Sequence, residues 1–351
     1  MNSAVAFALT PLGQLYGVAM KARRALYQSG RLRVHQLPAP VISVGNLTTG
    51  GTGKTPLVEW IARELAQAGQ RVCILTRGYG RDNAGTRVVV SDGAEIISDA
   101  AEAGDEPLLL AETLKGLAAV ISDADRVSAA HWAFENLHSQ VFVLDDGFQH
   151  LRVARDLNIL TIDATNPWGN RKLLPAGILR ESPAELARAD CIVITRADDP
   201  NATEVLRREI ATQSNAPIFG SQMKLKGLRA VRGELGELSI DDKEIRQSNI
   251  GAFCGLGNPE SFFSLLKLGG YRLAHTQVFR DHHTYTQSDI NRVVQDSIAR
   301  GAQFLLTTAK DEVKLRALNF ELPCYSVDIS IEIENADKLR KLIVNAVNTP
   351  A

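Results

Sequence analysis

The sequence predicts an α/β protein with a mostly parallel β-sheet that is covered by helices on both faces. Short apolar runs recur between residues 41 and 195, and helical stretches separate several of them. Parallel strands are buried on both faces, and each needs a crossover connection, usually a helix, to the next strand. A polar stretch near residue 222, followed by a second series of apolar runs, predicts a smaller second α/β domain.

The elements of the first domain follow from the spacing of apolar residues. VISVG at 41–45 predicts a buried strand, and apolar residues recur at helical spacing from Leu57 to Leu65, before Gly69, a natural helix end. We expect further helices at 107–116 and 126–137. We expect further strands at 71–76, 87–90, 118–121, 141–144, 157–162 and 191–195.

The second domain begins with a polar segment, residues 222–250, whose spaced glycines indicate a hairpin or a linker. After it we expect strands at 250–256, 303–308 and 324–329, and helices at 259–268 and 335–347. The predicted division is an N-terminal helical region at 1–34, a larger domain at 35–222 and a smaller domain at 223–351.

Composition argues against several classes of protein. The net charge of -1 leaves no excess positive charge with which a general nucleic-acid-binding protein would neutralise phosphates. The four cysteines form no C-x-x-C pair and lie in or beside apolar runs. This placement favours buried free thiols over disulfides or zinc ligands.

Residues 4–20 are mostly apolar, and the basic segment KARR follows them at 21–24. A signal peptide carries its positive charge before the apolar stretch, so this order argues against one. As a helix the segment would span about 26 Å, short of the ~30 Å hydrocarbon core of a bilayer. Two interpretations remain: an amphipathic helix in the membrane interface with its basic residues near anionic headgroups, or a helix packed on the protein's own core.

SVGNLTTGGTGKTP, residues 43–56, follows the first strand and approximates a phosphate-binding loop. The usual pattern is G-x-x-x-x-G-K-[ST], but Thr48 stands where the first glycine is expected. Phosphate binding needs inward backbone N–H groups, small residues and a helix N-terminus, all of which this segment offers. Lys54 can reach the β- and γ-phosphates, and the Thr55 hydroxyl suits Mg²⁺. The predicted nucleotide-binding residues are Gly50, Gly51, Thr52, Gly53, Lys54 and Thr55.

VFVLDDGFQH, residues 141–150, predicts an apolar strand that delivers Asp145 and Asp146 at its carboxyl end. An ordinary exposed strand end also accepts aspartate. With a phosphate-binding loop in the same sheet, the pair instead predicts the acidic residues that hold Mg²⁺ directly or through water.

Other motifs are ambiguous from their residues alone. Asp105 in GDEP fits either a helix N-cap or a proton acceptor beyond a parallel strand. DHH at 281–283 fits a surface histidine pair or one functional histidine beside a carboxylate. RGYGR at 77–81 and the segment 169–182 carry arginines that fit phosphate binding or solvated loop charge.

Together these motifs resemble the tetraacyldisaccharide 4'-kinases of lipid A biosynthesis, from residue 11 to about residue 290. In that family the loop also lacks the first glycine, so Thr48 is expected. One departure is Ala309 in TTAKDEVK, where the family tends to show an acidic residue, so Lys310 and Asp311 are assigned no role. The matching segments are PLGQLYG, SVGNLTTGGTGKTP, TRGYGR, GDEPLLLA, LDDGFQH, GNRKLLPAGILRE and RDHHTYT.

The resemblance implies a P-loop kinase that uses ATP and Mg²⁺ to phosphorylate the 4'-hydroxyl of a tetraacylated, lipid-linked glucosamine disaccharide 1-phosphate. Asp105, as proton acceptor, and His282 would form a dyad that deprotonates the hydroxyl. The metal would be served by Thr55, Asp145 and Asp146. The site would also be lined by Arg77, Tyr79, Gln149, His150, Arg180 and Glu181.

The resemblance also implies peripheral attachment to an anionic membrane surface, the cytoplasmic face of the bacterial inner membrane. That implication favours the interfacial interpretation of the N-terminal helix. No protein partner is implied.

Three alternatives share parts of this pattern. Dimeric ATPase switches have the GGTGKT segment but usually carry lysine before the glycine doublet, where this chain has Thr49. A GTPase would need N-K-x-D, and ITRAD at 194–198 lacks both Asn and Lys. A scaffold protein would leave the paired loop and Asp-Asp strand unexplained.

Overall fold

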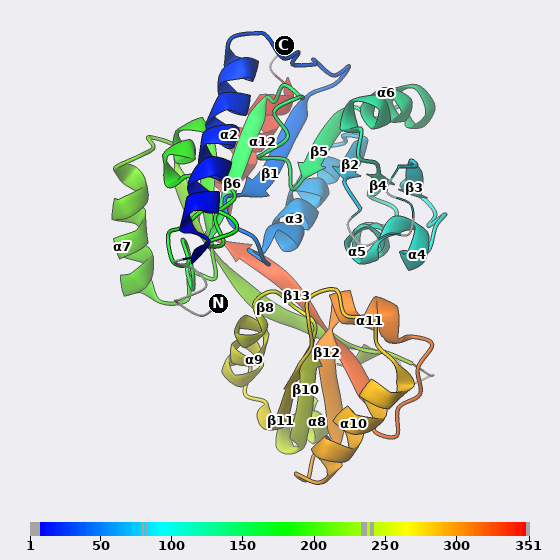
Figure 1. Cartoon of the computed structure of the whole chain (residues 1–351). Coiled ribbons are helices and arrows are strands. Elements are labelled where there is room, and N and C mark those ends of the chain that lie inside the picture. The colour runs from blue at the N-terminus through cyan, green and yellow to red at the C-terminus, as the bar shows by residue number, and fades with distance from the viewer. Residues whose placement is uncertain are drawn as a thin grey trace.

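The structure is a computed structural model of the chain and describes residues 8–78, 81, 83, 85–232, 237–238 and 242–348. It consists of two α/β bodies, drawn one above the other in Figure 1. The long strands β8 (Ile218–Ala230) and β13 (Cys324–Ile333) run between them.

The larger body is built on strands that pair in parallel. β3 is the exception, since it runs antiparallel to β4 at the edge of the sheet. Each strand predicted between residues 41 and 195 is present. From that edge inward the order is β3 (Val88–Ser91), β4 (Ala118–Ser122), β2 (Val72–Thr76), β5 (Val141–Asp145), β1 (Val41–Asn46), β6 (Leu157–Asp163) and β7 (Cys191–Thr195), and then β8.

Helices cover both faces of this sheet, as its apolar strands require. Neighbouring residues of β1 show the alternation, because Ile42 and Val44 belong to one buried cluster and Val41 to the other. The first face carries α3 (Lys54–Gln67), α5 (Asp105–Thr113), with the short α4 (Ala100–Ala103) before it, and α12 (Ala336–Asn348). The second face carries α6 (Arg126–Leu137), the 3₁₀ helix η1 (Pro183–Arg188) and α7 (Pro200–Ala211).

The smaller body repeats this plan around a parallel sheet that adjoins β13. Its strands are β11 (Arg272–Val278), β10 (Asn249–Cys254) and β12 (Phe304–Thr308). One face carries α8 (Lys243–Gln247) and α9 (Pro259–Leu268), and the other carries α10 (Gln287–Ile298) and α11 (Ala309–Leu315). β11 is not among the predicted strands, because this edge strand is exposed or half-buried throughout. The four cysteines of the chain are buried and free, as predicted.

Residues 222–250 differ from the predicted hairpin or linker. Up to Ala230 they continue β8, which pairs antiparallel with β13 along nearly its whole length. β9 (Glu237–Leu238) then folds back on β8, so a hairpin is present, but it follows a long strand. β8 begins beside β7 in the larger body and ends in the smaller one. We call this antiparallel pair, β8 and β13, the ribbon.

The C-terminal helix α12 also differs from the predicted division, which placed it in the smaller domain. Leu339 and Ile343 are fully buried in the same cluster as Leu57 of α3. Arg340 pairs with Glu64 across this contact, at 3.1 Å. The ribbon returns the chain to the larger body, and the order of elements along the sequence gives no sign of that return. A boundary near residue 222 remains our proposal for where the smaller domain begins.

The N-terminal helix α2 (Thr10–Gln28) packs on the larger body by one face and exposes apolar residues on the other. Gly17 is buried, and a Cβ there would lie 2.6 Å from Leu173 Cδ1. On the outer face Leu12, Leu15 and Val18 are 53%, 66% and 64% exposed. Within the described ranges, no helix has the length and apolar character that crossing a membrane would need.

Candidate active site

The phosphate-binding loop connects the carboxyl end of β1 to α3. Glycine is favoured at position 53, because its φ of 73° is left-handed and a Cβ there would lie 3.3 Å from Thr195 Cγ2. Gly50 is left-handed as well, with a φ of 101°. α3 begins at Lys54, so its first N–H groups and the positive end of its dipole lie at the loop. This geometry suits a bound phosphate.

Thr48 replaces the usual first glycine because the entry to this loop is extended. Thr48 forms an antiparallel bridge with Leu179, and Thr49 N donates to Ile178 O at 2.8 Å. Thr48 does not have a left-handed φ, so the position does not require glycine. The pairing also brings Arg180, the next residue, beside the loop.

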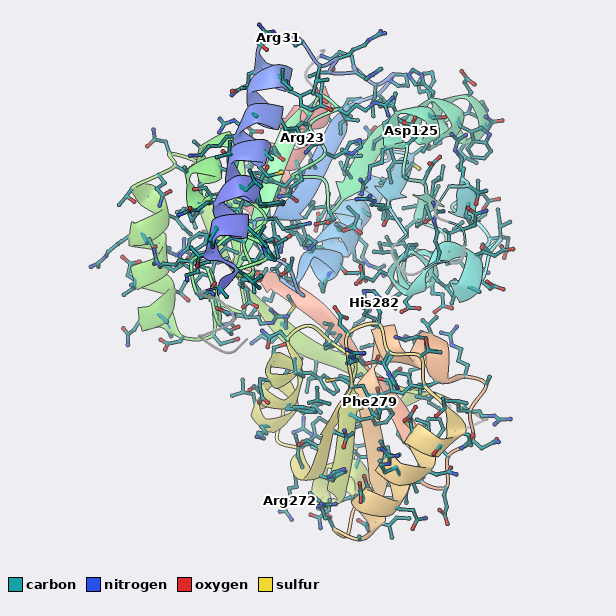
Figure 2. The ribbon with its side chains drawn as sticks, viewed as in Figure 1. Arg23, Arg31, Asp125, Arg272, Phe279 and His282 are labelled. Carbon is teal, nitrogen blue, oxygen red and sulfur yellow. The ribbon has the colours of Figure 1, made fainter. Side chains whose placement is uncertain are left out.

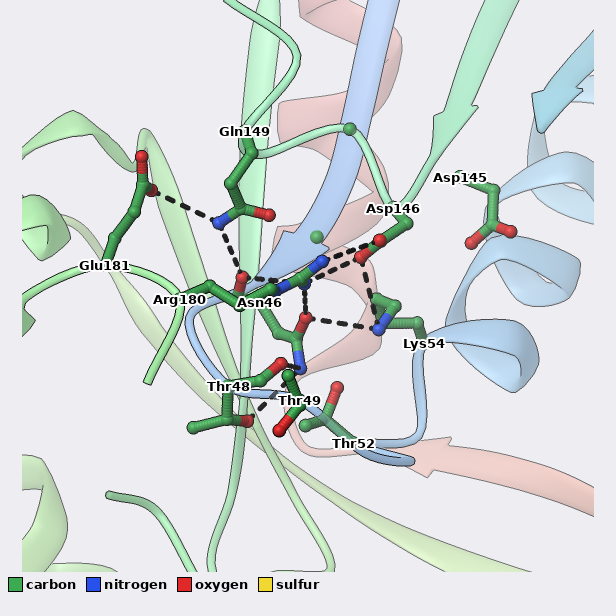
Figure 3. Close-up of polar contacts among 12 residues, drawn as sticks. Asn46, Thr48, Thr49, Thr52, Lys54, Asp145, Asp146, Gln149, Arg180 and Glu181 are labelled. Carbon is green, nitrogen blue, oxygen red and sulfur yellow. Dashed lines mark hydrogen bonds and ion pairs between the residues drawn. The ribbon is translucent and has the colours of Figure 1, made fainter. Parts of the chain in front are cut away.

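A cluster of charged and polar side chains lies on the inner side of the loop (Figure 3). Lys54 Nζ donates to Asn46 Oδ1 at 3.1 Å and lies 3.3 Å from Asp146 Oδ1. Arg180 donates to both carboxylate oxygens of Asp146, at 2.7 and 2.8 Å. Burial acts to raise the pKa of Asp146, but Lys54 and Arg180 outweigh it and hold that pKa below its ordinary value. Asp146 therefore stays ionised.

Asp145 lies apart from this cluster (Figure 3). Its Oδ2 accepts a hydrogen bond from Thr76 Oγ1 at 3.3 Å, and its carbonyl oxygen accepts one from Arg126 at 2.6 Å. Burial, and then the carboxylates of Glu106 and Asp146, raise the pKa of Asp145 to about 6. A cation would offset this accumulation of negative charge, which is what a Mg²⁺ ligand requires.

The donor set fits a metal that is held partly by nucleotide. Among the described residues, no group of three or more His, Cys, Asp or Glu side chains is placed to hold a metal ion. Mg²⁺ in phosphate-transfer sites is usually bound by one or two carboxylates together with phosphate oxygens and water. Asp145, Asp146 and the Thr55 hydroxyl in the first turn of α3 match that kind of site.

Gln149 and Glu181 form hydrogen bonds beside Asn46, at the start of the phosphate-binding loop. Gln149 Nε2 donates to Asn46 O at 3.0 Å and to Glu181 Oε2 at 3.2 Å (Figure 3). Burial raises the pKa of Glu181, although Arg188, which is ion-paired with it, acts in the opposite direction. Both predicted residues therefore belong to the network around Asn46.

The other predicted lining residues are less closely tied to this cluster. Burial, and then the charges of Arg126 and neighbouring arginines, lower the pKa of His150 to about 3, so its imidazole is neutral at physiological pH. Arg77 is exposed on the loop after β2, and Tyr79 lies outside the described residues.

Asp105 and His282 come from different bodies and meet where the bodies face each other. Figure 2 shows His282 at the rim of the smaller body nearest the larger one. Its Nδ1 lies 3.4 Å from Asp105 Oδ2. Asp105 is the first residue of α5, and the N-cap position is held by Gly104, without a side-chain cap. The helix-cap interpretation of Asp105 is therefore wrong, and the two residues predicted as a dyad are neighbours.

The adjacent His283 has a different environment. Its ring stacks on Phe279 with centroids 4.8 Å apart, and its Nε2 lies 3.2 Å from Asp289 Oδ2 in the first turn of α10. His282 has a left-handed φ of 57°, which turns the backbone between the two side chains. One histidine of the pair thus serves packing, and the other reaches the larger body.

The smaller body also approaches the phosphate-binding loop through the segment between β10 and α9. A Cβ on Gly257 would lie 3.1 Å from Gly50 Cα. Asn258 Nδ2 donates to Asp163 Oδ2 and to Thr165 Oγ1, both at 3.2 Å. The two bodies therefore touch on both sides of the predicted reaction centre.

Known proteins are similar to this sequence over most of its length. The family described as Tetraacyldisaccharide-1-P 4'-kinase matches residues 5–348. The chain belongs to this family. Relatives named tetraacyldisaccharide 4'-kinase include one from Geobacter metallireducens, 43% identical over 311 residues, and one from Desulfotalea psychrophila, 40% identical over 318 residues. The matches cover 88% and 90% of this chain, and 88% and 90% of those relatives.

A crystal structure of "apo" form LpxK from Aquifex aeolicus in complex with ATP has the same fold. It matches this tetraacyldisaccharide 4'-kinase family member with a TM-score of 0.77 and 32% sequence identity. The match covers 98% of this chain and 99% of that one, so both bodies are included. The predicted P-loop fold is confirmed.

Several polar residues of this candidate site were not predicted from the sequence. Asn46 lies at the end of β1 and accepts hydrogen bonds from Lys54 and Arg180. Lys310 and Lys314 of α11 reach across to the larger body, where they pair with Glu106 and Asp105. Because Ala309 departs from the family pattern, the sequence assigns this segment no role, although the two lysines at i and i+4 share one helix face.

Proposed function

We propose that this chain is an ATP-dependent kinase that transfers the γ-phosphate to the 4'-hydroxyl of a tetraacylated glucosamine disaccharide 1-phosphate, a lipid A precursor. One observation carries the proposal beyond family membership. The phosphate-binding loop and the Asp105–His282 pair both lie where the two bodies meet. An in-line transfer needs the phosphate donor and the proton acceptor on opposite sides of the transferred phosphoryl group.

The larger body supplies the ATP site. Backbone N–H groups of residues 50–55 cradle the phosphates, and Lys54 exchanges Asn46 and Asp146 for phosphate oxygens. Mg²⁺, when bound by Thr55, Asp145 and Asp146, supplies positive charge to the β- and γ-phosphates. Arg180 keeps Asp146 ionised and fixed in position meanwhile.

The proton acceptor is Asp105. As the 4'-oxygen bonds to the γ-phosphorus, its proton passes to the Asp105 carboxylate, the bond from that phosphorus to the β–γ bridging oxygen breaks, and ADP leaves. His282, 3.4 Å from Asp105, orients the carboxylate and shares its charge. The positive charges of Lys54 and the loop stabilise the transition state, where most of the catalysis of phosphoryl transfer arises.

The decisive experiment measures ADP formation with and without tetraacylated disaccharide 1-phosphate dispersed in detergent. We expect turnover that depends on the acceptor and a product carrying a new phosphate at the 4' position, identified by mass spectrometry. An otherwise identical acceptor that lacks the 4'-hydroxyl serves as the control and should give no product. ATP hydrolysis at one rate with either acceptor, or with none, would instead favour a switch ATPase.

We further propose that α2 attaches the enzyme to an anionic membrane surface, the cytoplasmic face of the inner membrane, where its lipid substrate resides. The outer face of α2 presents Leu12, Leu15 and Val18, which are all more than half exposed. The inner face is tied to the active-site network, because Arg23 donates to Gln149 O at 3.2 Å. A helix that is apolar outside and anchored inside suits an interfacial position.

Point variants test this attachment without removing the helix. Leu15→Glu should abolish co-sedimentation with vesicles that contain anionic lipid and leave activity on detergent-dispersed substrate intact. Val205→Glu is the matched control, because Val205 is an apolar residue that is 67% exposed on α7 rather than on α2. Equal vesicle binding by Leu15→Glu and the wild-type protein would exclude the outer face of α2 as the attachment surface.

A further inference from the structure

Two lysines of α11, Lys310 and Lys314, lie beside the Asp105–His282 pair. α11 of the smaller body and α5 of the larger body pack against each other (Figure 1). Both lysine side chains are well shielded from solvent, with exposures of 13% and 12%. A buried ammonium group is costly unless it is paired, so the partners of each lysine indicate its role.

Lys314 approaches the predicted proton acceptor directly. Its Nζ lies 3.2 Å from Asp105 Oδ2, the same oxygen that His282 Nδ1 approaches at 3.4 Å. Both of these contacts are made to Oδ2 rather than to Oδ1. A cation this close to a carboxylate oxygen favours the charged form of the carboxyl group.

Lys314 is itself held in place from behind. Its Nζ lies 3.8 Å from Asp311 Oδ1 and 5.6 Å from the centre of the Tyr285 ring. Asp311 is fully buried, and its Oδ2 accepts hydrogen bonds from Gly255 N at 2.9 Å and from Thr308 Oγ1 at 2.7 Å. The position of the ammonium is thus set by the core of the smaller body.

Lys310 has different partners. Its Nζ donates to Glu106 Oε1 at 2.8 Å and to Asp281 Oδ1 at 3.0 Å, and it lies 3.3 Å from His282 Nε2. Lys310 therefore contacts the far side of the imidazole ring. Lys314 therefore contacts Asp105, and Lys310, on the same helix, contacts His282.

We propose that Lys314 is a positioning residue for phosphoryl transfer, whose ammonium group keeps Asp105 ionised and correctly aligned when the two bodies are in contact. This inference rests on the proposed role of Asp105 as the proton acceptor. On this proposal the smaller body contributes directly to catalysis, because its Lys314 supplies the positive charge that keeps Asp105 ionised.

The charges that face Asp105 come from three elements. His282 lies in the loop before α10, Lys314 lies on α11, and Glu106, next to Asp105 on α5, pairs with Lys310. Burial acts to raise the pKa of Asp105, but His282 and Lys314 outweigh it and hold that pKa below its ordinary value. Without Lys314, fewer positive charges oppose the effect of burial, so the pKa of Asp105 should rise.

The test is the pH dependence of kcat for Lys314→Met in the full-length enzyme, with detergent-dispersed tetraacylated disaccharide 1-phosphate and saturating MgATP. Asp105 acts as a carboxylate, so activity falls as the pH drops through its pKa. We expect this acid limb to move upward by about 1 to 3 pH units. KM for ATP should change by about twofold at most, since the nucleotide is bound elsewhere.

Two further variants separate charge from mere contact. Lys314→Arg retains the positive charge and should keep the acid limb near its wild-type position. Lys267→Met is the matched control, because Lys267 is exposed on α9 in the same body. A simple structural contribution of Lys314 would lower kcat at every pH without moving the limb.

An acid limb of Lys314→Met that coincides with the wild-type limb overturns the inference, whatever the height of the plateau. If Lys314→Met does not fold, Lys314→Gln is measured in the same way and judged by the same shift. The proposed role of Asp105 fails by a different result: an Asp105→Asn variant that retains turnover would show that Asp105 is not the proton acceptor. If Asp105→Asn is inactive and the acid limb of Lys314→Met coincides with the wild-type limb, only the positioning role of Lys314 is excluded.

Discussion

The two halves of this active site are built in different ways. Lys54, Asp146 and Arg180 come from one edge of the larger sheet and hold one another through ion pairs of 2.7 to 3.3 Å. Asp105 and His282 come from separate bodies and approach to 3.4 Å. The phosphate-binding half is therefore complete whenever the larger body is folded, whereas the proton-accepting half also requires contact between the bodies. Nucleotide binding and chemistry should accordingly be separable by mutation.

Asp105→Ala should separate the loss of catalysis from the loss of nucleotide binding most strongly. Loss of a general base typically costs about 10² to 10⁴-fold in rate, so kcat should fall by that factor. ATP affinity, measured with a fluorescent analogue, should survive because the loop is unchanged. Asp296→Ala, which changes a half-exposed aspartate on α10, is the matched control. Near-normal turnover at saturating substrate would remove Asp105 from the mechanism.

Lys54→Ala should impair the phosphate-binding half of the site. Removing one positive group that stabilises the transition state costs about 10² to 10³-fold in kcat, and here ATP binding should weaken as well. Steady-state kinetics combined with direct ATP titration measure both effects. If ATP affinity stayed at the wild-type value, Lys54 would not be a phosphate ligand, and the contrast with Asp105 would disappear.

Asp145→Asn should abolish activity but stabilise the metal-free protein. The pKa of Asp145 is raised to about 6, above the ordinary value of 3.8, so the folded state binds the proton more tightly than the unfolded state. Wild-type stability is therefore lost as the pH rises from about 4 to 6, by about 2 to 3 kcal/mol in total.

Urea unfolding in EDTA at pH 7.5 and at pH 4 measures this effect. The Asn variant should be the more stable protein at pH 7.5, and the advantage should shrink toward zero at pH 4, where the wild-type carboxyl is protonated. A destabilised variant at pH 7.5 would show that the negative charge is not the dominant cost at this position.

The smallest effect should come from the contact between the bodies themselves. Arg316 of the smaller body donates to both carboxylate oxygens of Glu112 in the larger body, at 2.5 and 2.7 Å. Partly exposed pairs contribute about 0.2 to 1 kcal/mol, so Arg316→Gln should lower kcat by about twofold to fivefold and leave ATP affinity of the larger body unchanged. Arg208→Gln, which removes an exposed pair within α7, is the control.

Double substitution sharpens this last prediction. If the two residues act through each other, Arg316→Gln combined with Glu112→Gln should cost no more than either change alone. Additive losses would mean that the side chains act separately and that another contact holds the bodies together.

The predictability of the site follows the same division. The location of Lys54, Asp145 and Asp146 at one edge of the sheet could be predicted, because a parallel sheet brings the carboxyl ends of its apolar strands to the same edge. Lys314 could not, because its partner lies more than 200 residues away and depends on how two bodies approach. The same limit applies to Gly257 beside Gly50, which no local pattern indicates.

The fold shows this limit as well. Apolar runs and helical spacing predicted most strands and helices, since those signals are local. They did not predict β8, whose second half lacks a continuous apolar run and, apart from the buried Leu228, is exposed or half-buried. Nor did they assign α12 to the larger body, because its buried residues, Leu339 and Ile343, would suit either core.

The position of α12 has a consequence for the synthesis of this protein. Its buried residues complete a core whose first members, such as Ile42, leave the ribosome some 300 residues earlier. The smaller body lies between them in the chain and can fold as a unit before α12 emerges. Contacts so distant in sequence form late and leave apolar surface uncovered in the meantime. The face of α3 that α12 finally covers is thus where a chaperone has the longest opportunity to bind the nascent enzyme.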